Sequence, residues 1–304
     1  MEPIDLSLIF FSGASRSGTS GMVWDDFINE PYETFVSYLH NNGYHTVCIN
    51  GYDEKYYNRY HVYPNMGFDK CIFIDDFVNS LKYNGYISDI AITDEILNTL
   101  KLGENEFGDE PLFIYAMTVQ NHVYDLELKQ NSSDAKYVDI NWGDVKVSNK
   151  SKEDVYEYVN GLWVSVMGLN NLLDYLDETE RDTLVVFWGD HAPGFDGLDY
   201  KTYYDNDHLY KTPYLIWSNH QNNYIQPENI ELYQLSTLLV DYLHLPQTMC
   251  TYKNNYFMNK DYVDDAEYKR DVIDEIKMYN YMREFDSMNR YMWGDMKYQS
   301  ELYE

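Results

Sequence analysis

The chain has 304 residues, of which 44% are hydrophobic and 17% aromatic, enough to fill the core of one large α/β domain or two smaller ones. Lys and Arg total 22 against 51 Asp and Glu, which gives a formal net charge of −29. A surface this acidic repels the phosphate backbone of nucleic acids, so the sequence argues against a nucleic-acid partner. An anionic substrate would need local positive charge from a metal ion or a few arginines.

Cysteine usage and hydropathy argue against two further classes. The three cysteines include no Cys-x-x-Cys pair, which indicates neither a disulfide framework nor a zinc knuckle. The apolar run at residues 6–11 is too short for a signal-peptide core or a membrane helix. From the sequence as it stands we expect no membrane segment in this chain.

Short apolar runs alternate along the chain with longer amphipathic segments. The apolar runs predict strands at residues 5–11, 46–50, 71–74, 111–119, 183–188 and 214–217. The amphipathic segments predict helices at residues 32–41, 88–100, 152–176 and 231–243. This alternation predicts an α/β fold, a mostly parallel sheet flanked by helices on both faces. We expect one domain over residues 1–250 and a charged, helical C-terminal extension over residues 251–304.

Turn and cap residues mark the boundaries of these elements. Asn42-Gly43 predicts the end of the first helix, and Asn84-Gly85 predicts a turn. Ser88-Asp89 predicts the N-cap of the helix that follows. Residues 126–150 are polar and lack periodicity, so we expect a surface insertion near the functional site.

Residues 183–193 read TLVVFWGDHAP, an apolar run that ends in Gly189, Asp190 and His191. We interpret it as a strand covered on both faces, with Gly189 allowing a sharp turn that sets Asp190 beside His191. Ligands bind at the carboxyl ends of strands in open α/β sheets, and a carboxylate beside an imidazole favours Zn²⁺ or Mn²⁺ over Ca²⁺. Alternatively, Asp190 caps a following helix and His191 is an ordinary loop histidine.

Polar side chains also follow two other predicted strands. Tyr57 and Arg59 come after residues 46–50, where Arg59 offers a planar fork for phosphate or sulfate and Tyr57 an aromatic surface beside it. Alternatively, Arg59 forms a surface ion pair. His122 follows residues 111–119, a position suited to binding a phosphoryl oxygen or protonating a leaving group. Alternatively, His122 is an ordinary loop histidine.

Several motifs in one order resemble the lipoteichoic acid synthase family, sulfatase-like phosphotransferases of the alkaline phosphatase superfamily. The matching segments are LHNNGY at 39–44, YNR at 57–59, YPNMGFD at 63–69, GYISD at 85–89, TVQNH at 118–122, GDH at 189–191 and KTPYLIWSN at 211–219. The resemblance as a whole spans roughly residues 5–245. The resemblance implies a sulfatase-like catalytic domain over residues 1–250.

The resemblance also implies a divalent metal ion, Mn²⁺ or Zn²⁺, bound by Asp190 and His191. It implies that Arg59 and His122 contact the phosphoryl group. In such enzymes a threonine attacks a phosphodiester and carries a covalent glycerol phosphate until an acceptor or water takes it. The implied partner is a phosphoglycerol-bearing lipid or an envelope glycan, on the extracellular face of the bacterial membrane.

Two further substrate-binding residues, Tyr57 and Asn50, follow from the same alignment, although relatives often carry histidine at the position of Asn50. One alignment of the N-terminal residues places Thr19 on the nucleophile turn, where it is nucleophile and metal ligand. A second alignment sets residues 5–13 just after the nucleophile, and the threonine is then missing from this sequence. The family's glutamate ligand would be matched here by Glu2.

Three functions follow from these alternatives. The first is a metal-dependent phosphoglycerol transferase or phosphodiester hydrolase that acts on cell-envelope polymers or lipids. The second is a truncated or degenerate remnant of such an enzyme, which binds metal or envelope polymer without turnover. The third is a phosphoethanolamine transferase or sulfatase-like hydrolase, although no Cys/Ser-x-Pro-x-Arg segment is present to mature into a sulfatase nucleophile.

Overall fold

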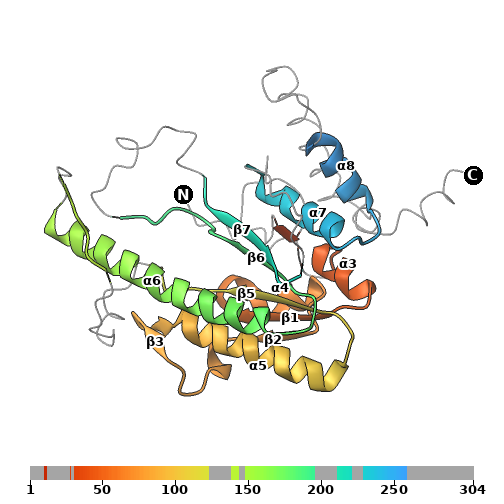
Figure 1. Cartoon of the computed structure of the whole chain (residues 1–304), viewed down its shortest axis with the longest axis horizontal. Helices are drawn as coiled ribbons and strands as arrows, with labels where there is room; N and C mark the ends of the chain where they lie inside the picture. The colour runs from red at the N-terminus through yellow and green to blue at the C-terminus, as the bar shows by residue number, and fades with distance from the viewer. Residues whose placement is uncertain are drawn as a thin grey trace, which may run out of the picture.

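The computed structural model describes residues 10–11, 28, 31–122, 138–143, 148–195, 211–220 and 229–258. At its centre, β1 (His45–Asn50) lies between β2 (Lys70–Ile72) and β5 (Leu112–Met117), as Figure 1 shows. Both neighbours pair with β1 in parallel. The predicted α/β fold with a parallel sheet and flanking helices is thereby confirmed.

The central strand is buried from its second residue to its last, as expected for an apolar strand covered on both faces. It follows α3 (Phe35–Asn41), whose N-terminus is capped by the Thr34 hydroxyl. The helix ends at Asn42-Gly43 as predicted, and Gly43 has a φ of 86° that suits glycine. The capped helix and the tight turn lead the chain directly into β1.

Two long helices, α5 (Asp89–Phe107) and α6 (Asn149–Asp177), pack against each other beside the sheet (Figure 1). Both are longer than the sequence predicted. Ser88 caps α5 as predicted, because its hydroxyl accepts a hydrogen bond from the amide of Ala91 at 3.1 Å. The helices approach closely at Gly168, where an added Cβ would lie 3.1 Å from the carbonyl oxygen of Asp89.

The strand β6 (Leu184–Trp188) departs from the predicted parallel pattern. In the described part of the chain it pairs antiparallel with β7 (Tyr214–Ser218). The prediction that it is covered on both faces is wrong, because Phe187 on β6 is 43% exposed and Leu215 on β7 is 37% exposed. An apolar run predicts a strand that is at least partly buried. It does not predict which strand lies next to it or whether the two run parallel.

The remaining elements are short. They are η1 (Tyr56–Asn58), α4 (Arg59–Asn65), η2 (Ile74–Asp76), β3 (Lys82–Tyr83), β4 (Tyr86–Ile87), α7 (Leu232–Tyr242) and α8 (Met249–Met258). β3 and β4 form a hairpin across the predicted turn, where Asn84 and Gly85 have φ angles of 49° and 84°. Two consecutive left-handed residues are typical of a two-residue hairpin turn.

Aromatic side chains fill much of the larger core cluster. Phe10 lies 4.9 Å from Trp188 between ring centroids, and Phe11 lies 4.7 Å from Tyr115. Both phenylalanines are helical, so the strand predicted at residues 5–11 is wrong at these two positions. A short apolar run is compatible with a buried helical turn as well as a strand, and periodicity alone does not separate them.

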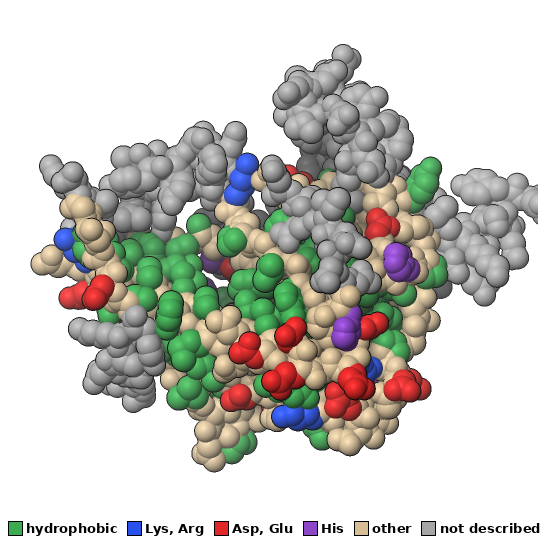
Figure 2. All heavy atoms as spheres, in the orientation of Figure 1, with side chains coloured by type: hydrophobic (Ala, Val, Ile, Leu, Met, Phe, Trp, Pro, Cys, Tyr) green, Lys and Arg blue, Asp and Glu red, His purple; other side chains and the backbone are tan. Residues whose placement is uncertain are grey.

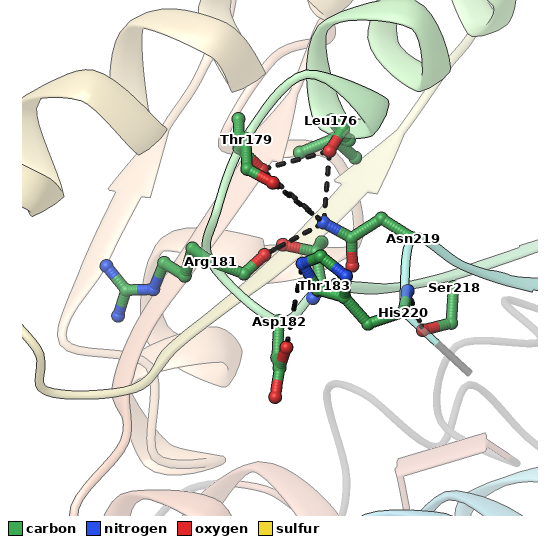
Figure 3. A network of polar contacts seen from close by, with 8 residues as sticks. All are labelled: Leu176, Thr179, Arg181, Asp182, Thr183, Ser218, Asn219 and His220. Carbon is green, nitrogen blue, oxygen red and sulfur yellow. Dashed lines mark hydrogen bonds and ion pairs between the residues drawn. The ribbon is translucent and has the colours of Figure 1, made fainter.

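Asn219, at the end of β7, joins the strand pair to the C-terminus of α6 (Figure 3). Its Nδ2 donates to the carbonyl oxygens of Leu176 at 3.0 Å and Arg181 at 2.9 Å. Its Oδ1 accepts from the amide of Thr183 at 2.9 Å. The last residue of the KTPYLIWSN motif therefore has a structural role, because it satisfies carbonyl groups where α6 ends.

Three predictions concern residues that the structure describes in part. The insertion at residues 126–150 falls mostly outside the described ranges, and α6 begins at its end. In the C-terminal extension, α8 is helical, and residues 259–304 lie outside the described ranges, so its boundary stays a prediction. Within the described residues, no helix combines the length and apolar character that a membrane span requires.

Candidate functional site

Asn50 and Met117 are the last residues of β1 and β5, and they face each other across the parallel pair. The Asn50 side chain is buried, and its Oδ1 accepts from the amide of Tyr52 at 3.0 Å. Its Nδ2 points to the sulfur of Met117 at 3.4 Å. Asn50 therefore closes the turn after β1, and its contact with a substrate stays a prediction.

The segment after β1 directs Arg59 into the protein. Tyr57 and Asn58 have left-handed backbone angles, with φ of 55° and 54°, which are uncommon for residues other than glycine. This geometry begins α4 at Arg59, which is 5% exposed. Because the side chain is buried, the alternative of a surface ion pair is wrong. Strained backbone of this kind often marks functional sites.

Aromatic rings lie beside the Arg59 guanidinium. Its Cζ is 5.4 Å from the ring centroids of both Tyr56 and Tyr57, and its Nη2 donates toward the sulfur of Met117 at 3.9 Å. Ring faces attract the cation without neutralising its charge. A guanidinium in such low-dielectric surroundings attracts an anion more strongly than one in bulk water. The structure thus places Tyr57 and Arg59 together at the carboxyl end of β5.

His122 lies in the loop that follows β5. The loop closes in a turn, because the amide of His122 donates to the carbonyl oxygen of Val119 at 3.0 Å. Burial lowers the pKa of His122, and the charge of His191 lowers it further, whereas Asp190 raises it. These electrostatic interactions require proximity. His122 therefore shares one region with the Asp190–His191 pair.

Asp190 and His191 lie just beyond β6. Asp190 Oδ2 is 3.4 Å from His191 Nε2, and the two side chains are 70% and 46% exposed. Asp190 Oδ1 accepts from the amide of His191 at 2.8 Å, and His191 Nδ1 lies 3.0 Å from the carbonyl oxygen of Ala192. Residues 191–195 form no helix, so the alternative of Asp190 as a helix cap is wrong.

Gly189 does not make the sharp turn that we predicted. Its φ is not in the left-handed range, and its amide donates to the carbonyl oxygen of Pro213 at 3.1 Å. An added Cβ would lie 3.4 Å from Thr212 Cβ, an ordinary contact. Gly189 is therefore still hydrogen-bonded to the residue before β7, and Asp190 follows just beyond the end of β6.

The Asp190–His191 pair suits a divalent metal ion in its donor chemistry. Carboxylate oxygen and imidazole nitrogen are ligands of Zn²⁺ and Mn²⁺, and both side chains are accessible. Among the described residues, no group of three His, Cys, Asp or Glu side chains is placed to hold a metal. A complete shell would need further ligands, and the predicted ligands Thr19 and Glu2 lie outside the described residues.

The sequence reasoning missed Tyr158 on α6, which lies near the same site. Burial raises the pKa of Tyr158, and the charge of Asp190 raises it further. Its ring contacts Phe195 edge to face at 5.5 Å between centroids. Helical periodicity predicted α6 as a packing helix, and one tyrosine among 33 carries no signal of its own.

The acidic surface of the chain makes the buried Arg59 important for binding an anion. On the face in Figure 2, acidic side chains gather over the lower part, and few basic side chains accompany them. The same view shows hydrophobic side chains along α6, where Leu162, Trp163, Val166 and Met167 are exposed. An anion that approaches a chain with a formal charge of −29 needs a cation inside the site, and Arg59 is placed to supply one.

A family model described as Sulfatase matches residues 10–278, well over half of the chain. The chain belongs to the sulfatase family. This membership confirms the sulfatase-like resemblance that the sequence motifs indicated. The fold of the chain is accordingly of the alkaline phosphatase and sulfatase type. Sulfatases of this type generally depend on divalent metal ions.

Solved structures share the fold of this sulfatase-family chain. The phosphoglycerol transferase GacH of Streptococcus pyogenes, in complex with sn-glycerol-1-phosphate, has a TM-score of 0.69 and 18% identity, covering 90% of this chain and 71% of that one. The lipoteichoic acid synthase LtaP of Listeria monocytogenes has a TM-score of 0.60 and 16% identity, covering 80% and 60%. At these identities the likeness shows the fold alone.

Two curated relatives come from Rhizobium meliloti. A putative cyclic beta-1,2-glucan modification protein is 23% identical over 209 residues, which cover 64% of this chain and 31% of the relative. The capsular polysaccharide biosynthesis protein RkpI is 28% identical over 188 residues, which cover 57% and 31%. The matched region thus spans about a third of each relative's length.

Proposed function

We propose that this chain is a metal-dependent phosphoglycerol transferase or phosphodiester hydrolase that acts on cell-envelope lipids or polymers. The observation that carries the proposal is the buried Arg59 beside Tyr57, at the carboxyl ends of β1 and β5. His122 follows β5 by one short loop, and its electrostatic contact with Asp190 and His191 adds the potential metal ligands.

Arg59 suits a phosphoryl group for two reasons. Its guanidinium presents parallel N–H donors that match two phosphate oxygens, and its charge offsets the negative charge that develops during phosphoryl transfer. Burial strengthens both interactions, because water does not screen them. The tyrosine rings beside it hold the side chain in place while it binds substrate.

His122 is suited to hydrogen-bond a phosphoryl oxygen or to transfer a proton to a leaving group. Asp190 and His191 would hold the metal ion, which when bound supplies a Lewis acid beside the phosphoryl oxygen and lowers the pKa of a nearby hydroxyl. Thr19 is the proposed source of that hydroxyl. The donor types of the Asp190–His191 pair support Mn²⁺ or Zn²⁺ as the metal.

The named relatives support the choice of substrate class. GacH is named a phosphoglycerol transferase and was solved with sn-glycerol-1-phosphate, and the two curated relatives are named for glucan and capsular polysaccharide. We therefore propose a phosphoglycerol-bearing lipid as donor and an envelope glycan or water as acceptor. An extracellular location at the bacterial membrane would bring the chain close to both the lipid donor and the glycan acceptor.

The test is turnover of two phosphodiesters in the presence of Mn²⁺ or Zn²⁺. Bis(4-nitrophenyl) phosphate reports hydrolysis, and phosphatidylglycerol in detergent micelles reports release of diacylglycerol. We expect metal-dependent turnover by the chain, and losses on the order of 100-fold in Arg59→Ala and His191→Ala, the effect of removing one strong electrostatic group.

Matched controls lie at the opposite end of β6 and β7. Arg181 donates to backbone carbonyls there, and His220 is 46% exposed, as His191 is, with Asp182 at 3.7 Å (Figure 3). Arg181→Ala and His220→Ala should retain activity. Equal losses in a site variant and its control would contradict the proposal, and metal binding without turnover would favour a non-catalytic remnant.

A further inference from the structure

Ser165 of α6 is the centre of a buried hydrogen-bond network. Its hydroxyl donates to Asp89 Oδ2 at 2.6 Å and accepts from Asn121 Nδ2 at 2.8 Å and Gln120 Nε2 at 3.1 Å. Asp89 begins α5, whereas Gln120 and Asn121 belong to residues 118–122, which we call the His122 loop. One hydroxyl group therefore links α5, α6 and the His122 loop.

Gln120 also connects the His122 loop to both α5 and α6. Its Oε1 accepts from the backbone amide of Asp89 at 2.8 Å, and its Nε2 also donates to the carbonyl oxygen of Gly161 at 2.9 Å. Gln120 is 1% exposed and Asp89 is 6% exposed. Polar groups this deeply buried are destabilising when they lose their partners, so the network strongly favours one loop conformation.

The Asp89 carboxyl is also electrostatically perturbed by its surroundings. Burial raises the pKa of the Asp89 carboxyl to about 6. Ser165 and Thr118 lower this pKa by hydrogen bonding, but the effect of burial is larger. The loop is thus attached to Asp89 through the backbone amide of Asp89 at Gln120 and through Ser165 at Asn121. His122 is the next residue in the chain after these attachments.

Two glycines of α6 allow this close approach. A Cβ on Gly161 would overlap the amide oxygen of Asn121, and a Cβ on Gly168 would lie 3.1 Å from the carbonyl oxygen of Asp89. Glycine weakens a helix interior relative to alanine. Its occurrence at both contacts fits a helix that is shaped to receive the loop and the start of α5.

We propose that Asp89 and Ser165 are positioning residues that hold His122 in the orientation from which it contacts the substrate phosphoryl group. The inference rests on the proposed function, because it gives His122 a role in the reaction. Asp89 and Ser165 themselves do not touch the substrate. They act through Gln120 and Asn121, and a small displacement of a reacting group lowers the rate steeply.

The test compares Ser165→Ala with a matched variant, Thr93→Val. Thr93 is 6% exposed on α5, one turn beyond Asp89, and its hydroxyl lies beside Gly168 at the same helix interface. Both variants remove one hydroxyl from the interface between α5 and α6, and only Ser165→Ala removes the link to the His122 loop. Turnover of bis(4-nitrophenyl) phosphate and hydrogen exchange of residues 118–122 are measured for each, together with Asp89→Asn and His122→Ala.

We expect Ser165→Ala to lower kcat by roughly 10- to 100-fold with little change in KM, and to speed exchange in the His122 loop. Thr93→Val should change neither. Asp89→Asn should retain most activity, because an amide oxygen still accepts from Ser165. In a His122→Ala background, Ser165→Ala should have no further effect on kcat, since residues that act through one group are not additive.

Additive losses in the double variant, or equal losses in Ser165→Ala and Thr93→Val, would overturn the proposal. The exchange measurement does not depend on turnover. If the chain turns over neither phosphodiester, the proposed function fails, while faster exchange of residues 118–122 in Ser165→Ala alone still supports the positioning of the loop. Unchanged exchange in that variant overturns the positioning role, whatever the chain's activity.

Discussion

Gly67 packs directly against the backbone of Ser37: a Cβ added to Gly67 would lie 2.7 Å from Ser37 Cα and 2.8 Å from its nitrogen. Gly67 belongs to the YPNMGFD motif and follows α4, and Ser37 belongs to α3. The two helices therefore meet at a point where only glycine fits. The position is also left-handed, with a φ of 103°.

Gly67→Ala should be strongly destabilising, and Gly43→Ala is its control. Gly43 is also left-handed, with a φ of 86°, but an added Cβ there has no atom within 4 Å. The control should lose roughly 1–2 kcal/mol from backbone strain alone. Gly67→Ala should lose clearly more, because α3 or α4 must shift. Urea unfolding of both variants measures the difference, and equal losses would show that the packing contact contributes nothing.

Asn219→Ala should destabilise the chain by about 1–3 kcal/mol, because it leaves partly buried backbone groups near the end of α6 without their partner. The side chain donates to Leu176 and Arg181 and accepts from Thr183. Ser218→Ala is the control, since among the described residues the Ser218 hydroxyl accepts a single long hydrogen bond, of 3.4 Å from the amide of His220. Thermal unfolding that shifts equally in both variants would contradict the capping role.

Sequence patterns located most elements because burial and periodicity are local properties. β1 and β5 read as apolar runs, and Asp190, Arg59 and His122 stood out because polar residues follow such runs. The Ser165 network was not predictable, since its partners Asn121 and Asp89 are 44 and 76 residues away in sequence. No local pattern records which polar side chains meet between packed helices.

The raised pKa of Asp89 predicts a pH-dependent stability difference between the chain and Asp89→Asn. The carboxyl pKa is about 6 in the folded chain and about 4 in an unfolded one, so the folded state binds the proton more tightly. The contribution of Asp89 to stability is therefore full below about pH 4 and is lost as the pH rises through 6.

Asp89→Asn removes this loss, because an amide does not ionise. Its stability relative to the unsubstituted chain should rise by up to about 3 kcal/mol between pH 4 and pH 8. Ser165 and Thr118, the groups that bond to Asp89, are neutral throughout this range. Unfolding in urea at several pH values measures the difference. A difference that stays constant with pH would show that Asp89 titrates normally.

Arg59→Lys should weaken substrate binding although it keeps the positive charge. Lysine lacks the planar fork that binds two phosphate oxygens, and its compact ammonium matches the two tyrosine rings less well than a guanidinium. We expect a loss of roughly 10-fold or more in kcat/KM, the effect of one strong hydrogen bond. Full activity in Arg59→Lys would mean that charge alone is sufficient at this position.

The most direct measurement is calorimetric titration of Mn²⁺ and Zn²⁺ into the chain, into Asp190→Ala and into Asp182→Ala. Asp182 pairs with His220 at the far end of the strands, as Asp190 pairs with His191 at the site. We predict one divalent ion bound per chain, retained in Asp182→Ala and lost in Asp190→Ala without loss of fold. Unchanged metal affinity in Asp190→Ala would contradict the assignment of the site.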